Sequence, residues 1–206
     1  RVGVISGFPD QRFYPFLDLT RGQAAGMLYE ALSQPLSVRE GTPAPVPVEA
    51  AYPTLKRGDG GPMVGWMERR LAALTYRPGS VDGVYDKATA DAVTAFQKVE
   101  RLQRTGTAMD AVLHRLASAA APGPRRSVAG SRVEIDLTRQ VLFVIRDNQV
   151  QWTIPAATGA QGTRTPTGTF TIQRKLPYWR ESYLGLLYKP AYFYGGYAIH
   201  GSHSVP

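Results

Sequence analysis

The stretch VEIDLTRQVLFVIRDNQVQWTI, residues 133–154, contains three short runs in which apolar and polar residues alternate. The apolar positions are Val133, Ile135, Leu137, Val141, Phe143, Ile145, Val150, Trp152 and Ile154. A period of two places these side chains on one face of a β-strand. The RDNQ segment, residues 146–149, supplies turn-forming Asp and Asn between the second and third runs. The stretch therefore predicts antiparallel strands joined by tight turns.

The residues that follow continue this β-rich part of the chain. ATGAQGTRTPTGTFTI, residues 157–172, predicts a Gly/Thr-rich loop that leads into another strand at Phe170 and Ile172. Eight aromatic residues then lie between positions 178 and 197, and they are equally consistent with core packing and with a lid over a substrate. The chain ends on YAIHGSHSVP, residues 197–206, which holds His200 and His203.

Residues 54–118 have a helical pattern instead. Apolar residues repeat at intervals of three and four in three segments, and Asp86 is a predicted N-cap for the second helix. The turn-rich segment RPGSVDGVYD, residues 77–86, separates the first two helices. His114 lies on the third helix, where no partner is evident, and we expect a structural role for it. The apolar positions are Val64, Met67, Leu71, Leu74, Ala88, Ala92, Val93, Phe96, Val99, Val112, Leu113 and Leu116.

Proline-rich and glycine-rich segments divide the chain into pieces. Residues 34–53 contain five prolines and predict an extended linker, and residues 119–130 predict a second, shorter one. In the first piece, residues 1–33, Thr20 and Gln23 form a predicted capping box at the start of a helix. We therefore expect a multidomain α+β protein: a small three-helix bundle at 54–118, followed at 131–206 by a mainly antiparallel, incomplete β-sandwich.

Composition and charge restrict the functions that the chain can have. The net charge is +8, but the basic residues form no run or aromatic-interleaved stripe, so we expect no nucleic-acid partner. A diffuse positive charge suits a polyanionic surface and equally suits simple solubility. No apolar run is long enough to span a membrane. The given residues contain no starting Met and no signal peptide and open in the middle of a longer sequence, so targeting cannot be read from them directly. The absence of cysteine excludes disulfides and thiolate zinc sites within these residues.

Three chemical roles are open to His200. A metal site is disfavoured because His200 and His203 supply two imidazoles where zinc needs three or four ligands. A serine enzyme would use Ser202 or Ser204 as nucleophile, but Ser202 lies two positions along the expected strand and points the same way as His200. The third role is a general base whose nucleophile lies beyond residue 206. We expect no metal and no cofactor.

The segments VEIDLTRQVLFVI, ATGAQGTRTPTGTFTI and YAIHGS resemble the catalytic domain of the L,D-transpeptidases, a β-sandwich with a TP.G.F loop. That family has an HG pair, here His200-Gly201, followed a short distance on by SHGC. The resemblance implies that His200 is the catalytic base, with Gly201 beside it, and that the nucleophilic cysteine lies past Pro206. It also implies a reaction in which a thiolate attacks a peptidoglycan stem peptide, D-Ala leaves, and an amine from another stem resolves the thioester into a 3→3 crosslink. No substrate-binding residue is assigned.

Two further resemblances point to the bacterial cell wall. Residues 54–117 resemble the type 1 peptidoglycan-binding domain through Gly58, Gly61, Val64, Leu71, Asp82-Gly83, Thr89, Ala92-Val93 and Phe96-Gln97. Residues 1–33 resemble half of an S-layer homology repeat. There Arg21 matches the residue that contacts secondary cell-wall polymer, although a structural role at the helix start is equally open for it.

These resemblances imply an extracellular, wall-associated L,D-transpeptidase whose partners are stem peptides, the sacculus and secondary wall polymer. The 206-residue chain on its own is expected to be inactive because it has no thiol. The alternative is a non-catalytic wall-binding protein with a degenerate β-domain. An SHGC motif after Pro206 would support the enzyme, and its absence would support the binding protein.

Overall fold

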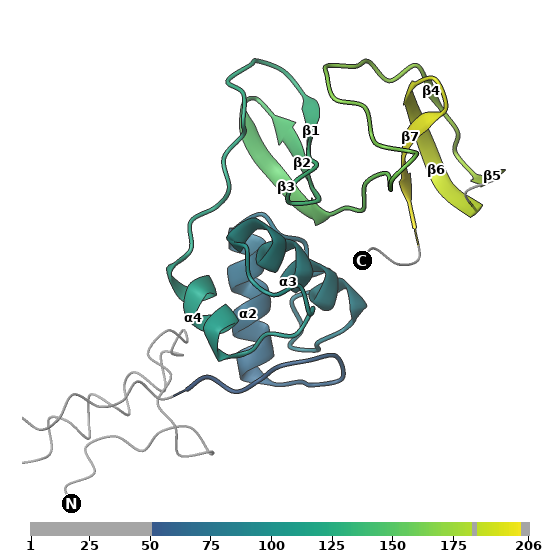
Figure 1. Ribbon diagram of the computed structural model, residues 1–206. Coiled ribbons are helices and arrows are strands. Elements are labelled where there is room, and N and C mark those ends of the chain that lie inside the picture. The colour runs from purple at the N-terminus through teal and green to yellow at the C-terminus, as the bar shows by residue number, and fades with distance from the viewer. Residues whose placement is uncertain (1–50, 183–184, 203–206) are drawn as a thin grey trace, which may run out of the picture.

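The computed structural model describes residues 51–182 and 185–202, and the predicted helix that starts at Thr20 lies outside this part of the chain. Its first unit contains α2 (Pro62–Ala73), α3 (Lys87–Glu100) and α4 (Asp110–Ser118). Figure 1 shows these helices gathered into one bundle below the strands. The three helices lie where the apolar periodicity predicts them. The Asp86 carboxylate caps α3 by accepting a hydrogen bond from the Thr89 backbone N–H at 2.8 Å.

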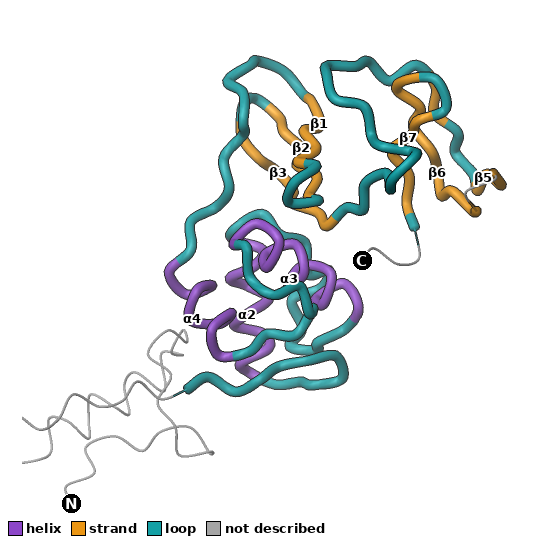
Figure 2. Tube along the Cα trace, viewed as in Figure 1, coloured by secondary structure: helices purple, strands orange, loops and turns teal. Residues whose placement is uncertain are grey.

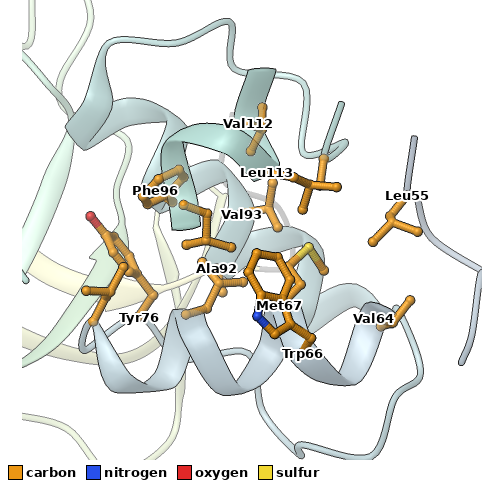
Figure 3. Close-up of a cluster of buried hydrophobic side chains, with 14 of the residues drawn as sticks. Leu55, Val64, Trp66, Met67, Tyr76, Ala92, Val93, Phe96, Val112 and Leu113 are labelled. Atoms are coloured by element: carbon orange, nitrogen blue, oxygen red, sulfur yellow. The ribbon is translucent and has the colours of Figure 1, made fainter. Parts of the chain in front are cut away.

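The bundle has a core of its own (Figure 3). Every buried hydrophobic member of this cluster lies between Tyr52 and Ala119. Phe96 is fully buried and meets the Tyr76 ring edge-on, with centroids 5.5 Å apart. The loops close around the same core, because Tyr52 stacks on Trp66 and the backbone of Leu55 pairs with that of Ala108. A self-contained core of this kind allows the bundle to fold independently.

A buried carboxylate organises the turn between α2 and α3. Glu68 is fully buried and accepts hydrogen bonds from the Gly83 backbone N–H at 2.8 Å and the Thr89 hydroxyl at 2.9 Å. Gly83 has φ +78°, and an added Cβ there would lie 3.2 Å from the Gly61 carbonyl oxygen. This network is not evident from the sequence, because Glu68 occupies an ordinary helical position and its partners, Gly83 and Thr89, lie far along the chain.

The second unit consists of two antiparallel sheets. The first has the order β1-β2-β3, from β1 (Arg132–Asp136), β2 (Val141–Arg146) and β3 (Gln149–Pro155). The turn between β2 and β3 is made by Asp147 and Asn148, which both have positive φ, as a tight hairpin requires. The second sheet has the order β4-β6-β5, with β7 also paired to β6. Its strands are β4 (Arg174–Lys175), β5 (Trp179–Ser182), β6 (Gly185–Tyr194) and β7 (Tyr197–Gly201).

One predicted strand is wrong. Phe170 and Ile172 lie in the long loop between β3 and β4 (Figure 2), and strand pairing starts only at Arg174. Phe170 packs instead against the rings of Phe193 and Tyr194, with centroids 5.3 and 5.4 Å away. The alternation that suggested a strand therefore reflects an aromatic anchor for the loop rather than a hydrogen-bonded ladder.

The bundle and the first sheet share a packed interface. The Thr75 carbonyl accepts a hydrogen bond from the Thr153 backbone N–H at 2.9 Å, and the two threonine hydroxyls lie 3.0 Å apart. Thr75 adopts φ +70°, an unusual conformation for a β-branched residue. Val99 of α3 packs against the sheet's core of Val141, Phe143, Ile145 and Val150. The bundle and the β-unit are therefore joined by side-chain packing as well as by the 119–130 linker.

Lys98 lies buried in this interface and donates a hydrogen bond from Nζ to the Ala156 carbonyl at 3.0 Å. Burial lowers the pKa of its ammonium from the ordinary value of 10.5, and the nearby Arg104 guanidinium adds to the effect. Between the lowered pKa and 10.5 the unfolded chain binds more protons than the folded one. Stability therefore rises with pH in this window.

We predict that Lys98→Met reduces the rise of stability with pH. For one proton, that rise amounts to at most about a tenfold change in the folding equilibrium constant per pH unit. The measurement is urea unfolding from neutral pH to about pH 9.5, below the range in which unfolded tyrosines ionise. Lys87→Met, which removes an exposed lysine of the same helix, should keep the slope. Equal slopes in wild type and Lys98→Met would show that Lys98 stays charged in the fold.

Candidate active site

His200 lies near the end of β7, and its side chain is exposed. Its Nδ1 lies 3.0 Å from the Gly201 carbonyl oxygen. A carbonyl can only accept, so in the neutral ring Nδ1 carries the proton and Nε2 is the basic nitrogen. Within the described residues Nε2 has no hydrogen-bond partner, which leaves it available to take a proton from a nucleophile.

Gly201 has a steric role beside this histidine. It pairs with Tyr188 of β6, and an added Cβ would lie 3.0 Å from Tyr188 Cδ1 and 3.2 Å from its Cβ. The Tyr188 ring in turn packs on the Trp179 ring, with centroids 4.8 Å apart. A glycine after His200 thus lets an aromatic pair lie directly against the strand end, which limits the positions open to the imidazole.

The loop between β3 and β4 forms another wall of the site. Its Gly159 backbone N–H donates to the Thr165 hydroxyl at 2.8 Å, and a Cβ at Gly159 would lie 1.9 Å from the Thr163 carbonyl oxygen. Gly168 of the TPTGTF segment has φ +146°, and an added Cβ there would lie 3.2 Å from the Phe170 ring. A close backbone approach therefore requires glycine at position 159, and a positive φ favours it at position 168.

We predict that Gly159→Ala opens this loop while the bundle stays intact. The new methyl group cannot coexist with the Thr163 carbonyl, so the turn at residues 160–163 must rearrange. Amide exchange in the 157–165 peptide should accelerate about tenfold, as expected for about 1.4 kcal/mol of lost local stability. Gly196→Ala, at a turn where a Cβ meets no atom within 4 Å, should leave exchange unchanged. Unchanged exchange in Gly159→Ala would contradict this loop geometry.

A cleft of about 820 Å³ brings these parts together between the bundle and the two sheets. Figure 1 shows β7 running back toward the bundle, which brings its end to this region. His200, Gly201 and Ser202 line the cleft beside Thr165 of the loop. The opposite wall comes from the bundle and includes Gly79 of the segment before α3, with Ala88 and Asp91 of α3. The remaining lining is largely apolar and includes Leu142, Ile154, Phe193 and Ile199.

The other residues considered from sequence divide into two groups. Arg21, His203 and Ser204 lie outside the described residues. Ser202 follows the last residue of β7, and the hydrogen bond of the His200 ring goes to the Gly201 carbonyl rather than to the Ser202 hydroxyl. Among the described residues no group of three or more His, Asp or Glu side chains is arranged to hold a metal ion.

His114 has partners that the sequence did not reveal. Its Nε2 lies 3.3 Å from an Asp110 carboxylate oxygen one turn earlier, and its ring meets the Tyr52 ring edge-on at 4.6 Å. The sequence shows no partner for His114, but the structure supplies two, Asp110 and Tyr52. The reason is that Tyr52 is distant in the sequence, and that Asp110 is an ordinary acidic residue at the first position of α4. The half-buried histidine is structural in this setting.

Two cations that line the cleft, Arg77 and Lys189, were not identified as site residues from sequence. Neither belongs to a motif, and they lie more than a hundred residues apart in the chain. The only sequence signal was the turn character around Arg77. Their proximity in one cleft depends on the packing of the bundle against the sheet, which a single sequence does not show.

Comparison with family models matches residues 130–205 to the L,D-transpeptidase catalytic domain, residues 60–116 to a peptidoglycan binding domain and residues 3–25 to the S-layer homology domain. None of the curated proteins matches the chain significantly. The crystal structure of the L,D-transpeptidase from Xylanimonas cellulosilytica is 38% identical, with a TM-score of 0.68 over 81% of this chain and 83% of that chain. The chain therefore belongs to the L,D-transpeptidase family.

Two further solved structures resemble the chain less closely in shape. The L,D-transpeptidase from Stackebrandtia nassauensis is 26% identical over 72% of this chain and 76% of that chain, with a TM-score of 0.39. The endolysin of Burkholderia AP3 phage is 36% identical over 34% of this chain and 27% of that chain, with a TM-score of 0.32. Within the described residues, no helix has the length and apolar character needed to cross a membrane.

Proposed function

We propose that this protein is an extracellular, cell-wall-associated L,D-transpeptidase that forms 3→3 crosslinks in peptidoglycan, with His200 as the general base. The observation that carries the proposal is the position of His200: its Nε2 is open in a cleft bordered by the TPTGTF loop, in a chain of this family. The proposed nucleophile is a cysteine after Pro206, at the place that the resemblance of His200-Gly201 to the family's HG and SHGC pattern implies; residues 1–206 contain no cysteine. We refer to the protein that includes this cysteine as the thiol-bearing form.

The chemistry explains why a histidine is needed. A free cysteine has a pKa of about 8.5, so its thiol is mostly protonated at neutral pH. His200 therefore takes the thiol proton as the sulfur attacks. The sulfur bonds to the carbonyl carbon between the L-centre of the diamino acid and D-Ala. The C–N bond then breaks, and the D-Ala nitrogen leaves with the proton from His200. An amine of a second stem then attacks the thioester carbonyl carbon and gives its proton to His200. The C–S bond breaks, which releases the thiolate.

The test is the reaction of the thiol-bearing form with a stem tetrapeptide that ends in D-Ala. We expect release of D-Ala and formation of a crosslinked dimer linked between diamino acids, both of which mass spectrometry identifies. The 206-residue chain should release no D-Ala. A protein without SHGC after Pro206 and without D-Ala release would instead be a non-catalytic wall-binding protein with a degenerate β-domain.

The N-terminal parts are proposed to hold the enzyme at its substrate. The helical bundle would bind the peptidoglycan sacculus, and residues 1–33, with Arg21 as the contact residue, would bind anionic secondary wall polymer. The family-model matches at residues 60–116 and 3–25 support these two assignments. Attachment through two modules would raise the local concentration of stem peptides around the cleft.

We predict that the isolated bundle, residues 51–119, co-sediments with purified sacculi. It should fold alone because its buried core is self-contained. If turn and groove contacts dominate, binding to sacculi should fall only modestly as the salt concentration rises. A bundle held mainly by charge would lose affinity steeply, because salt screens the attraction between charges. Heat-denatured bundle is the control for non-specific trapping. Absence of co-sedimentation at low salt would show that the bundle is a spacer.

A further inference from the structure

The cleft is lined by four side chains of the types that carry charge near neutral pH, and their charges are not balanced. These are Arg77, Asp91, Lys189 and His200. Asp91 is already neutralised on its own helix, because Lys87 Nζ lies 2.5 Å from its carboxylate. Arg77 and Lys189 form no ion pair with any described residue. The cleft therefore presents two uncompensated cations to whatever binds beside His200.

Both cations are held in place by aromatic rings. The Arg77 guanidinium carbon lies 4.4 Å from the centre of the Trp152 ring, on the bundle side of the cleft. The Lys189 Nζ lies 5.2 Å from the centre of the Tyr188 ring, on the side of the second sheet. A cation over a ring face is attracted by the ring's quadrupole, yet its hydrogen-bond donors stay free. The stacking restricts where these long side chains point without satisfying their charge.

The backbone supports the placement of Lys189. Lys189 has φ +46°, which is rare for a residue other than glycine, and the pairing of β6 with β7 is irregular between Tyr188 and Ala191. A bulge of this kind redirects a side chain next to a site. Tyr188, under the Lys189 ammonium, packs directly on Gly201, the neighbour of His200. Lys189 is thus tied through one ring to the strand end that carries the base.

We propose that Arg77 and Lys189 bind the free C-terminal carboxylate of the donor peptide and so hold its scissile carbonyl at His200. The inference rests on the proposed function, since D-Ala at the end of the donor stem carries that carboxylate. Arginine offers two parallel N–H donors to a carboxylate, and lysine offers a compact positive charge. In this arrangement the wall-binding bundle supplies a specificity residue to the catalytic cleft and acts as more than a tether.

The binding test uses the 206-residue chain, which has no cysteine and therefore cannot turn the ligand over by the proposed route. Calorimetric titration compares the stem tetrapeptide ending in D-Ala with the same peptide as its C-terminal amide. We expect the acid to bind about tenfold more tightly than the amide. Arg77→Gln and Lys189→Gln should each weaken the acid about fivefold to tenfold and leave the amide unchanged, as expected for loss of one charge-assisted hydrogen bond.

Matched controls separate this effect from a general loss of positive charge. Arg146→Gln and Lys175→Gln remove exposed cations of β2 and β4 that do not line the cleft, and they should leave both affinities unchanged. Arg77→Lys should recover part of the acid preference. Equal binding of acid and amide by the wild type, binding of neither, or equal weakening of both ligands by Arg77→Gln would overturn the proposal.

The proposal and the proposed function can fail separately. If the thiol-bearing form releases D-Ala but the 206-residue chain shows no preference for the acid, the carboxylate site is wrong and the transpeptidase assignment stands. If the acid preference and its loss in the variants are observed without any D-Ala release, the cleft binds carboxylate peptides and the catalytic assignment is wrong. In the thiol-bearing form, the site predicts that Arg77→Gln raises KM for the donor more than it lowers kcat.

Discussion

His200→Ala in the thiol-bearing form is expected to lower the rate of acylation by a carbapenem about 10²–10⁴-fold, the usual cost of losing a general base. Without the imidazole the thiol stays mostly protonated, and the one carboxylate among the described residues that line the cleft, Asp91, is paired with Lys87. His200 is exposed, and within the described residues its ring hydrogen-bonds to the adjacent Gly201 carbonyl alone. The substitution should therefore leave the fold intact, and the loss should be chemical. Intact-mass spectrometry after timed incubation measures the adduct directly.

His203→Ala is the matched control, because it removes the neighbouring imidazole from a position with no counterpart in the HG motif. It should retain most of the acylation rate. His114→Ala, in the bundle, should do the same because its contacts are with Asp110 and Tyr52. Equal adduct formation in wild type and His200→Ala would show that the base has been assigned wrongly.

Phe96→Ala should lower the free energy of unfolding of the bundle by about 3–5 kcal/mol, the usual cost of removing a fully buried phenylalanine ring. Phe96 has no exposed surface and contacts Tyr76, whose neighbour Thr75 bonds to the first sheet. The cavity would therefore weaken both the bundle core and the interface with the sheet. Urea unfolding followed by the helical circular dichroism signal measures the change.

Tyr178→Ala is the control of similar size for this measurement. Tyr178 is 56% exposed, so its removal should change the stability of the bundle by less than about 0.5 kcal/mol. A loss below about 1 kcal/mol in Phe96→Ala would contradict the packing in Figure 3, because a close-packed core cannot collapse around so large a void at no cost.

The elements with strong periodicity could be predicted from the sequence. The three helices and the first three strands follow from apolar spacing, and the Asp86 cap from its position before that pattern. The strand predicted at Phe170 and Ile172 is wrong because apolar residues that anchor a loop to an aromatic cluster can be spaced two apart, as in a strand. Period-two alternation reports a buried face, and it does not report whether a partner strand is present.

Features that depend on long-range packing could not be predicted. Glu68 and Lys98 read as ordinary charged helix positions, yet both are buried and bonded to distant backbone. His200 was identified because its motif is local in sequence. Arg77 and Lys189 were not, because they come together only when the bundle packs on the sheet. A site residue that belongs to a short motif can be identified from one sequence. A cleft whose walls come from two units cannot.

The measurement that tests the central claim most directly is the intact mass of the thiol-bearing form during reaction with the stem tetrapeptide. The account predicts a transient adduct equal to the tetrapeptide minus D-Ala, located on the cysteine and absent after thiol alkylation. Release of D-Ala that persists after alkylation, or that occurs in the 206-residue chain, would contradict a cysteine acyl-enzyme with His200 as its base.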